Sequence, residues 1–452
     1  MSKRIAVCLL LVLTASLLFA GGDKEKGAAT GPAEISMCVW GMPWENKLYT
    51  DILIPKFESE NTNVKVSFHH FENYQDKVPM LYAGGEMPDV VRILAQNTTM
   101  WVDKGMFLPL DDFMDKPKSA GGIDRKDFIP TMMDIATVKG KIYAIPQDIN
   151  FRGLMYNKAL FKKGGVGFPT YDWTWEDLRI SSKKLDFIEG EDQFGFGAWW
   201  SDGCFQVFMG LADGEIWDKS LENPLINGRG GVEALQLWRD LIGDKDPYLV
   251  TGTPSSGAIG GIGADKYFEM GKRAMHVDGM WRPPSVTKNA PELDFGVIPV
   301  PRKAKGVGHY HANHGCLFGV NSKSKFPEAS WKLARSLVSD GAGVTYWRQT
   351  WVGPPARYSD HEDPNFKNLI GIPGVVPGLD TADQYQERCQ WVIDLLAEKH
   401  AKPDAYWIKS LYNTERADRL KDAIEAVLLN NADIQKTLDK AVKEIKDYIK
   451  NQ

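Results

Sequence analysis

Two spacings of apolar residues alternate along the first hundred positions and predict a strand, a helix and two more strands. Residues 34–39 and 64–68 have the pattern of strands. Residues 48–61 carry an apolar stripe at helical spacing, Leu48, Ile52 and Phe57, with Pro55 interrupting it. A Gly84-Gly85 turn then leads into a third strand from Val90. A strand, a helix and a parallel strand form a βαβ unit, whose ligand sites lie in the loops after the strands.

Further along, apolar and polar positions predict a crossing segment and a terminal helix. Ile142 with Ala144, and Leu154 with Tyr156, alternate as strands do, and Pro146 between them cannot donate a backbone hydrogen bond. We expect this extended, poorly paired segment to act as a hinge. At the other end, residues 434–449 keep one apolar helical face, and the preceding residue Asp433 is placed to cap the helix. Residues 203–263 match no pattern that can be interpreted.

The N-terminus has the pattern of an export signal. Lys3 and Arg4 precede an apolar run over residues 5–19, and small residues follow at Ala20 and Gly21. The run is shorter than the roughly 20 apolar residues that span a bilayer. We therefore expect residues 1–20 to be a signal peptide cleaved after Ala20, and residues 21–33, which are small and polar, to be a flexible tether. A lipoprotein would need a cysteine where Gly21 stands, so we expect a soluble periplasmic protein.

Length, charge and cysteine content limit the possible classes. The 452 residues exceed the roughly 250 to 300 at which single cores stop growing, so two lobes are expected. A formal net charge of −5 without a basic cluster argues against nucleic acid and anionic membranes as partners. The cysteines beyond the signal are too widely spaced for a CxxC motif, and we expect four buried thiols, with a disulfide left open: Cys38, Cys204, Cys316 and Cys389.

One passage carries a family resemblance. Residues 140–161 read Gly-Lys-Ile-Tyr-Ala-Ile-Pro-Gln-Asp-Ile-Asn-Phe-Arg-Gly-Leu-Met-Tyr-Asn-Lys-Ala-Leu-Phe, and Phe168-Pro169 and Trp173-Thr-Trp-Glu-Asp-Leu178 follow. This resembles the interlobe crossover of family 1 extracellular solute-binding proteins, the sugar-binding components of ATP-driven (ABC) importers, such as maltose-binding protein. Residues 267–281, 293–301 and 320–331 are similar to later motifs of that family, in the same order.

The resemblance implies an architecture and a function. It implies an α/β, two-lobed periplasmic binding protein fold of type II, in which each lobe is a mixed sheet flanked by helices and the ligand cleft lies between them. Lobe 1 would comprise residues 34–149 and 298–340, and lobe 2 residues 150–297 and 341–452. It also implies a monomer without a cofactor, which closes over a mono- or oligosaccharide and presents it to the permease subunits of an ABC transporter.

Aromatic residues point to the same class of ligand. The chain has 15 tryptophans, and sugars present flat C–H faces ringed by hydroxyls, which suit aromatic rings and polar side chains. Matching the family pattern by position implies these ligand contacts: Trp40, Trp44, Gln96, Asn97, Asp148, Asn150, Trp199, Trp200, Asp202, Trp281 and Trp351. Gln96 and Asn97 stand where maltodextrin-binding members often show Asp-Arg, so the identity of the sugar stays open.

Other interpretations compete with this one. Tryptophans often pack in cores, and Asp148 could merely cap a turn. No serine-hydrolase, phosphate-loop or zinc-protease motif is present, which favours a protein that is not an enzyme, but a glycoside hydrolase needs only two carboxylates. Metal capture is a further alternative, because His309, His311 and His314 are close in sequence and the first two would project from one face of a strand.

Overall fold

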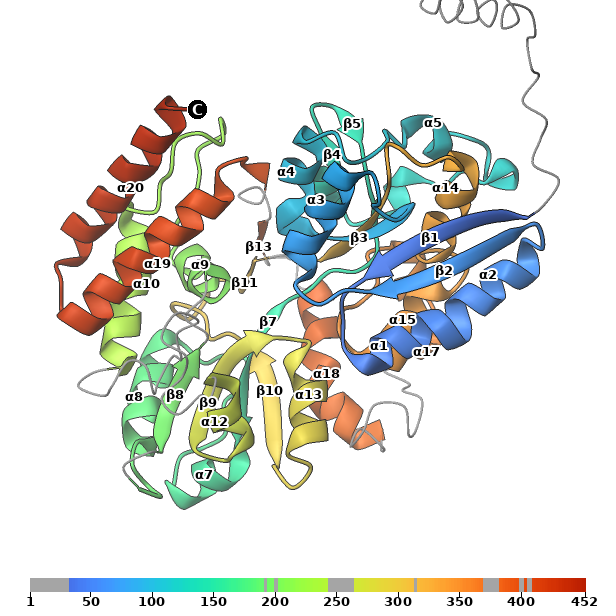
Figure 1. The fold of residues 1–452 in the computed structure, drawn as a ribbon. Helices are drawn as coiled ribbons and strands as arrows, with labels where there is room; N and C mark the ends of the chain where they lie inside the picture. The colour runs from blue at the N-terminus through green and yellow to red at the C-terminus, as the bar shows by residue number, and fades with distance from the viewer. Residues whose placement is uncertain are drawn as a thin grey trace, which may run out of the picture.

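The computed structural model describes most of the chain after the N-terminal segment. The described residues are 32–190, 193–198, 202–242, 264–312, 315–368, 382–397, 402–404 and 409–452. The expected export signal, most of the expected tether, Trp199, Trp200 and His314 lie outside this part. Two separate β-sheets, each with helices around it, form the two lobes visible in Figure 1. This confirms the two-lobed α/β architecture.

The first sheet has the strand order β2-β1-β3-β12-β6. Its strands are β1 Ala33–Val39, β2 Val64–His70, β3 Val90–Leu94, β6 Ile145–Pro146 and β12 Cys316–Val320. β1 runs parallel to β2 and β3, with Ala33 opposite Val64 and Met37 opposite Val90. The three predicted strands and the βαβ unit are therefore confirmed. β12 lies antiparallel between β3 and β6, and β6 is the edge strand on that side of the sheet.

The helix between β1 and β2 starts earlier than predicted and changes its winding. It runs through α1 Pro43–Leu48, a π-helical turn at Tyr49–Leu53, and α2 Ile54–Glu60. The predicted stripe placed Ile52 inward, but Ile52 is 36% exposed and Leu53 is buried instead. The π-helical turn has more residues per turn than an α-helix, so it shifts the apolar face by one position. Pro55 sits in the first turn of α2, where its missing amide is tolerated.

The second sheet has the order β10-β7-β9-β8. Its strands are β7 Arg152–Asn157, β8 Phe194–Ala198, β9 Arg273–Gly279 and β10 Phe295–Pro299. β7 is antiparallel to both neighbours, so the start of β7 lies beside the end of β9, with Arg152 opposite Gly279. Figure 1 shows this sheet in the lower lobe with α12 Ala264–Glu269 and α13 Arg282–Asn289 near it.

The segment between β6 and β7 joins the two sheets. As Pro146 predicts, β6 pairs with β12 through two residues only. Beyond β6, Asp148 forms an isolated bridge to Pro355, and the N–H of Ile149 donates to the carbonyl of Pro354 at 3.0 Å. A second connection leaves β10 and contains β11 Tyr310–Ala312, which pairs in parallel with β13 Lys402–Asp404.

Helices cover both sheets and complete the lobes. Asp433 caps α20 Ile434–Lys450 by accepting from the N–H of Lys436 at 2.8 Å, which confirms the predicted cap. α15 Ala342–Thr350 packs against α1 of the first lobe, which favours placing the end of lobe 1 later than residue 340. The lobe boundaries stay a prediction. The remaining elements are α3 Tyr74–Gly84, α4 Thr98–Asp103, α5 Asp111–Met114, α6 Pro130–Ala136, β4 Thr137–Val138, β5 Lys141–Ile142, α7 Lys158–Lys163, α8 Trp175–Leu185, α9 Asp202–Leu211, α10 Arg229–Ile242, α14 Pro327–Ser336, α16 Tyr358–His361, α17 Pro364–Lys367, α18 Ala382–Ala397 and α19 Asn413–Asn430.

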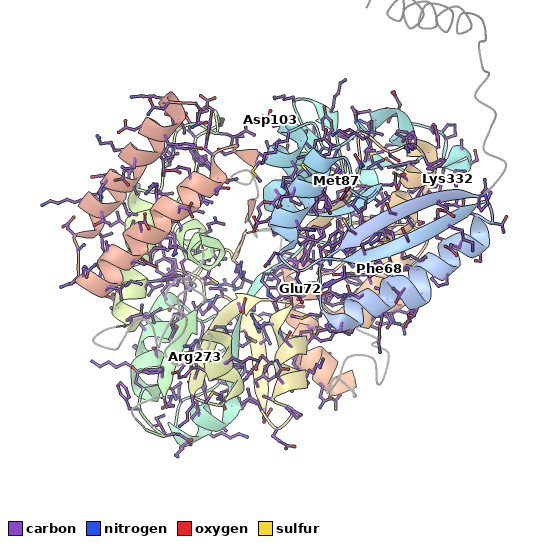
Figure 2. All side chains as sticks on the ribbon, viewed as in Figure 1. Phe68, Glu72, Met87, Asp103, Arg273 and Lys332 are labelled. Carbon is purple, nitrogen blue, oxygen red and sulfur yellow. The ribbon has the colours of Figure 1, made fainter. Side chains whose placement is uncertain are left out.

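Side chains fill the interior of each lobe in Figure 2. All four cysteines beyond the signal are buried thiols, as expected: Cys38, Cys204, Cys316 and Cys389. Within the described ranges, no helix combines the length and the apolar character that crossing a membrane requires.

Candidate functional site

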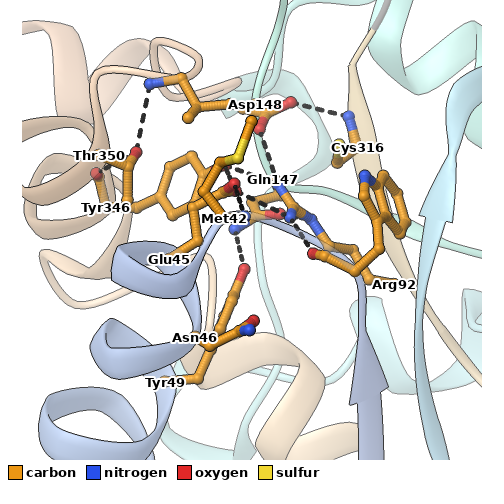
Figure 3. A network of polar contacts seen from close by, with 12 residues as sticks. Met42, Glu45, Asn46, Tyr49, Arg92, Gln147, Asp148, Cys316, Tyr346 and Thr350 are labelled. Carbon is orange, nitrogen blue, oxygen red and sulfur yellow. Dashed lines mark hydrogen bonds and ion pairs between the residues drawn. The ribbon is translucent and has the colours of Figure 1, made fainter. Parts of the chain in front are cut away.

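A buried arginine of the first lobe binds side chains and backbone from several segments of the chain. Arg92 lies in the middle of β3, and its side chain is 1% exposed. Its Nε donates to Gln147 at 2.9 Å, its Nη1 to the carbonyl of Trp40 at 3.0 Å, and its Nη2 to the hydroxyl of Tyr346 at 2.6 Å. Figure 3 shows Arg92 with Gln147 and Tyr346, which come from different segments of the chain. Because a buried guanidinium must have its donors satisfied, Arg92 fixes the positions of all these segments.

Two carboxylates balance the charge of Arg92. Glu45 Oε1 accepts from Arg92 Nη1 at 3.1 Å and from the hydroxyl of Tyr346 at 2.9 Å, and its Oε2 accepts from the N–H of Met42 at 2.8 Å (Figure 3). Asp148 lies 3.5 Å from Arg92 Nη2. Glu45 thus caps the first turn of α1 from within the helix and ties that turn to β3.

Asp148 and Asn150 lie together in the segment that joins the lobes. Asp148 Oδ1 accepts from Asn150 Nδ2 at 3.0 Å and from the N–H of Cys316 at 2.7 Å. Burial raises the pKa of Asp148 to about 6, and the nearby Arg92 guanidinium opposes that rise. Asn150 Oδ1 is buried without a hydrogen-bond partner, whereas Asp148 Oδ2 is the oxygen that faces Arg92 Nη2 in the ion pair. The Asn150 oxygen is available to a donor that enters the site.

The ring of Trp40 stacks against the guanidinium of Arg92. The Arg92 guanidinium carbon is 4.8 Å from the centre of the Trp40 ring, and the Tyr74 ring is 5.0 Å away on a tilted plane. Trp40 follows β1 and is half-buried. The cation–π contact and the tyrosine hold the indole in one orientation while part of it reaches the surface.

The second lobe has a similar arrangement where β7 begins and β9 ends. Asp278 is buried and accepts from Arg282 Nε at 2.7 Å and from the N–H of Gly279 at 2.7 Å, while Arg152 Nη1 lies 3.6 Å away. Burial acts to raise the pKa of Asp278, but Arg282, His276 and Arg152 together hold it well below its usual range. Asp278 therefore stays ionised and anchors both arginines.

Trp281 completes this arrangement. The Arg152 guanidinium carbon lies 5.1 Å from the centre of the Trp281 ring, which is half-buried. A Cβ atom at Gly279 would come within 2.1 Å of that ring, so only glycine at this position admits the indole. Each lobe thus holds a tryptophan against an arginine that pairs with a carboxylate. We call these units the Trp-Arg pairs, Trp40 with Arg92 and Trp281 with Arg152.

The other expected contact residues lie outside the two Trp-Arg pairs. Trp44 lies in α1, and Lys288 Nζ from α13 of the second lobe is 5.0 Å from the centre of its ring. Gln96 is exposed in a 3-10 turn, and Asn97 donates to Gln75. Trp351 is 1% exposed and its ring is 4.6 Å from that of Trp347, a geometry that favours packing.

Asp202 is the first residue of α9, but its side chain lies outside the described residues, as do Trp199 and Trp200. Ligand contact by any expected residue stays a prediction.

The sequence did not reveal which charged and polar residues hold the tryptophans in place. These are the charged Glu45, Arg92, Arg152 and Asp278 and the neutral Tyr346. One signal was present: Arg92 interrupts the apolar run Val-Val-Arg-Ile-Leu of β3, and a charge in a buried strand needs partners. Nothing local indicates that Tyr346, far away in the chain, supplies one of those partners.

The histidine alternative has little geometric support. His309 is 3% exposed and its ring nitrogens lie 3.4 Å from Arg302 Nη2, a cationic neighbour that disfavours a bound metal cation. Within the described ranges, no three histidine, cysteine or acidic side chains form a group that could hold a metal. The side chain of His311, and His314, lie outside those ranges.

Comparison with known proteins agrees with the two-lobed fold. The arabinooligosaccharide-binding protein of Bacillus subtilis (strain 168) is 23% identical over 84% of this chain and 89% of its own. A substrate-binding protein from Listeria monocytogenes, in complex with cycloalternan, superposes with a TM-score of 0.74 at 22% identity, covering 92% of this chain and 99% of its own. A Mycobacterium tuberculosis protein in complex with glycerophosphocholine has a TM-score of 0.73 at 18% identity, covering 93% and 99%.

These similarities show the fold, and membership of a family rests on a separate match. The family model for bacterial extracellular solute-binding proteins matches residues 44–344, a range that includes Arg92, Arg152 and Trp281 but not Trp40. That family consists of binding proteins rather than enzymes. On this match, the chain belongs to the bacterial extracellular solute-binding protein family.

Proposed function

We propose that this chain captures a carbohydrate, a mono- or oligosaccharide, between its two lobes and delivers it to the permease of an ABC importer. The observation that supports this most is the Trp-Arg pair in each lobe, since Trp40 and Trp281 are both half-buried and both held by an arginine. Fixed indole rings provide flat surfaces for sugar C–H faces. The name of the Bacillus subtilis relative supports the same class of ligand.

The mechanism is closure about the segment that joins the lobes. A sugar that contacts Trp40 in one lobe and Trp281 in the other interacts with both lobes only when they approach each other, so it stabilises the closed state. Asp148 and Asn150 lie in the joining segment, and the buried oxygen of Asn150 that has no hydrogen-bond partner would accept from a sugar hydroxyl. The other expected contacts, among them Trp199, Trp200, Asp202 and Trp351, belong to this proposal. No covalent step is needed, and we propose that the chain is not an enzyme.

The location and partners follow from the same proposal. The family is extracellular, and we propose export to the periplasm with cleavage after Ala20. We also propose that the chain is a monomer that contacts permease subunits of the inner membrane and no nucleic acid. We keep lobe 1 as residues 34–149 and 298–340 and lobe 2 as residues 150–297 and 341–452, with the contact between α15 and α1 favouring a later final boundary.

Thermal unfolding of residues 21–452 with a ligand panel tests this proposal. The panel contains arabinose, glucose, arabino- and malto-oligosaccharides and glycerophosphocholine, each with and without EDTA. A ligand at about one hundred times its dissociation constant stabilises a protein by about 2.7 kcal/mol, which is a measurable shift. We expect a rise with one saccharide class that EDTA does not change and during which the sugar is not consumed. A shift with glycerophosphocholine alone, or consumption of the sugar, would contradict the proposal.

A further inference from the structure

A cavity of about 410 Å³ lies on the first lobe, and none of its lining residues belongs to the Trp-Arg pairs. The lining residues fall within three stretches of the chain: residues 118–127, residues 335–340 from the end of α14 onward, and residues 357–359. α14 lies on the side of the first lobe that is away from the second sheet (Figure 1). The volume is within the roughly 300 to 1,000 Å³ of small-molecule sites.

Hydrogen bonds hold two of these stretches together. Asp127 accepts from Arg357 Nε at 2.9 Å through Oδ2 and from the N–H of Ser359 at 2.8 Å through Oδ1. The 3-10 turn that contains Asp127 is itself capped, because Asp124 Oδ1 accepts from the N–H of Lys126 at 2.9 Å. This part of the cavity wall is therefore fixed by bonds within the first lobe.

Positive charges outnumber negative charges on the cavity wall by one. Four cationic and three acidic side chains line the cavity. Asp127 pairs with Arg357, whose Nη2 is 2.6 Å away, and Asp340 pairs with Arg335, whose Nη1 is 3.4 Å away. Two carboxylates are thus compensated by arginines of the wall itself. Asp124 is the third, and it faces the two remaining cations.

Those two cations and one arginine nitrogen are donors without a partner. Lys118 and Lys126 are exposed, and in the part of the chain that the structure describes neither ammonium group forms a hydrogen bond or an ion pair. Arg335 Nε is buried and has no hydrogen-bond partner among the described residues. Unsatisfied cationic donors that line one cavity attract an anion, because charge-assisted hydrogen bonds are stronger than neutral ones.

We propose that this cavity is a binding site for a phosphate group, carried by inorganic phosphate or by a small phosphate monoester. A phosphate monoester presents three strong acceptor oxygens, as many as the unpaired donors of Lys118, Lys126 and Arg335, whereas a carboxylate presents two. Lysine and arginine are side chains that proteins use to bind phosphate. The site does not depend on the proposed saccharide function.

Titration calorimetry of residues 21–452 without saccharide tests this site. The probes are inorganic phosphate, methyl phosphate and acetate, with sodium chloride added to equalise ionic strength. Lys118→Gln and Lys126→Gln each remove one ammonium group from an exposed position, and Arg335→Lys keeps the charge but removes Nε. Lys332→Gln is the control, because Lys332 is also exposed and belongs to α14 but does not line the cavity (Figure 2).

We expect both phosphates to bind the wild type, and acetate to bind about tenfold more weakly. Each cavity variant should lose about tenfold in phosphate affinity, the loss expected from one hydrogen bond to a charged group, and Lys332→Gln should match the wild type. Tighter binding of methyl phosphate supports a monoester as the ligand, and tighter binding of inorganic phosphate supports the free ion.

Three results would overturn the site. These are no binding of either phosphate, acetate binding as tight as phosphate binding, and phosphate affinities of the cavity variants equal to that of the wild type. Saccharide affinity, measured separately, should be the same in all these variants, because none of the substituted residues belongs to the Trp-Arg pairs. Loss of the phosphate site would therefore leave the proposed function standing.

Discussion

At the scale of single residues, the two Trp-Arg pairs show how charge supports an aromatic surface. The guanidinium carbons of Arg92 and Arg152 lie 4.8 and 5.1 Å from the centres of the indole rings. Arg92 forms an ion pair with Glu45, and Arg152 forms one with Asp278. The carboxylates keep the buried guanidinium charge compensated, and the guanidinium fixes the ring. The tryptophans were predictable from sequence because their type and position after strands are visible there. Their supporting charges come from distant segments and were not.

Trp281→Ala tests the second-lobe pair. Removing a half-buried ring that contacts the ligand should weaken saccharide binding by about tenfold or more, since aromatic contacts contribute of order 1 kcal/mol beyond area burial. The unfolding temperature should fall only modestly. Trp173→Ala is the matched control, because Trp173 is also half-buried but packs on Phe161 at 6.1 Å, and its loss should leave affinity unchanged. Calorimetry showing the same affinity for Trp281→Ala and wild type would remove Trp281 from the site.

Asp148 predicts a pH dependence of stability. Its pKa is raised from 3.8 to about 6 by burial, so the folded state binds the proton more tightly than the unfolded state does. The resulting stabilisation is fully present below about pH 4 and is lost as pH rises through about 6. Asp148→Asn should therefore flatten the pH profile of the free energy of unfolding in this window.

Urea unfolding from pH 4 to 7 measures that effect. Burial also raises the pKa of Asp360 to about 6, so the Asp148→Asn variant should keep part of the slope, and Asp360→Asn is a parallel comparison. A profile for Asp148→Asn that coincides with wild type would show that Asp148 does not titrate in this range.

At the scale of elements, local patterns predicted the strands well and the phase of one helix badly. β1, β2 and β3 follow alternation and turn residues that are local in sequence. The helix after β1 contains a π-helical turn, which moves Leu53 to the core in place of Ile52. No residue type in that turn indicates the π-helical winding from the sequence alone.

The end of β9 gives an element-scale prediction. At Gly279 a methyl group would approach the Trp281 ring within 2.1 Å, so Gly279→Ala should displace the ring and weaken saccharide binding about as much as Trp281→Ala does. Near-ultraviolet circular dichroism should report the altered indole. Gly84→Ala is the control, since a Cβ there meets nothing within 4 Å at the end of α3. If Gly279→Ala binds and absorbs like wild type, the ring does not depend on this glycine.

At the scale of the whole molecule, contacts from one lobe to the other bear on closure. Lys409 pairs with Asp134 at 2.7 Å, and Lys288 lies 5.0 Å from the centre of the Trp44 ring. Sequence motifs in consistent order predicted two lobes and a joining segment. They could not predict these contacts, because they join residues hundreds of positions apart whose approach depends on the arrangement of the lobes.

Lys409→Met tests whether the ion pair supports closure. Its loss should weaken monosaccharide binding by about two- to fivefold, the range of partly exposed ion pairs, and should reduce the dependence of affinity on salt. Lys139→Met is the matched control, because Lys139 pairs with Asp103 at 2.8 Å within the first lobe. Equal affinities for both variants at low salt would show that the ion pair between the lobes does not contribute to closure.

A saccharide that binds between the lobes and contacts both should draw them together. Small-angle X-ray scattering of residues 21–452, with and without the saccharide that stabilises the protein most, measures this directly. We expect a smaller radius of gyration with saccharide, and a clearly smaller change for Trp281→Ala when the saccharide concentration is close to the wild-type dissociation constant. A saccharide that binds by calorimetry but leaves the radius of gyration of the wild type unchanged would contradict closure.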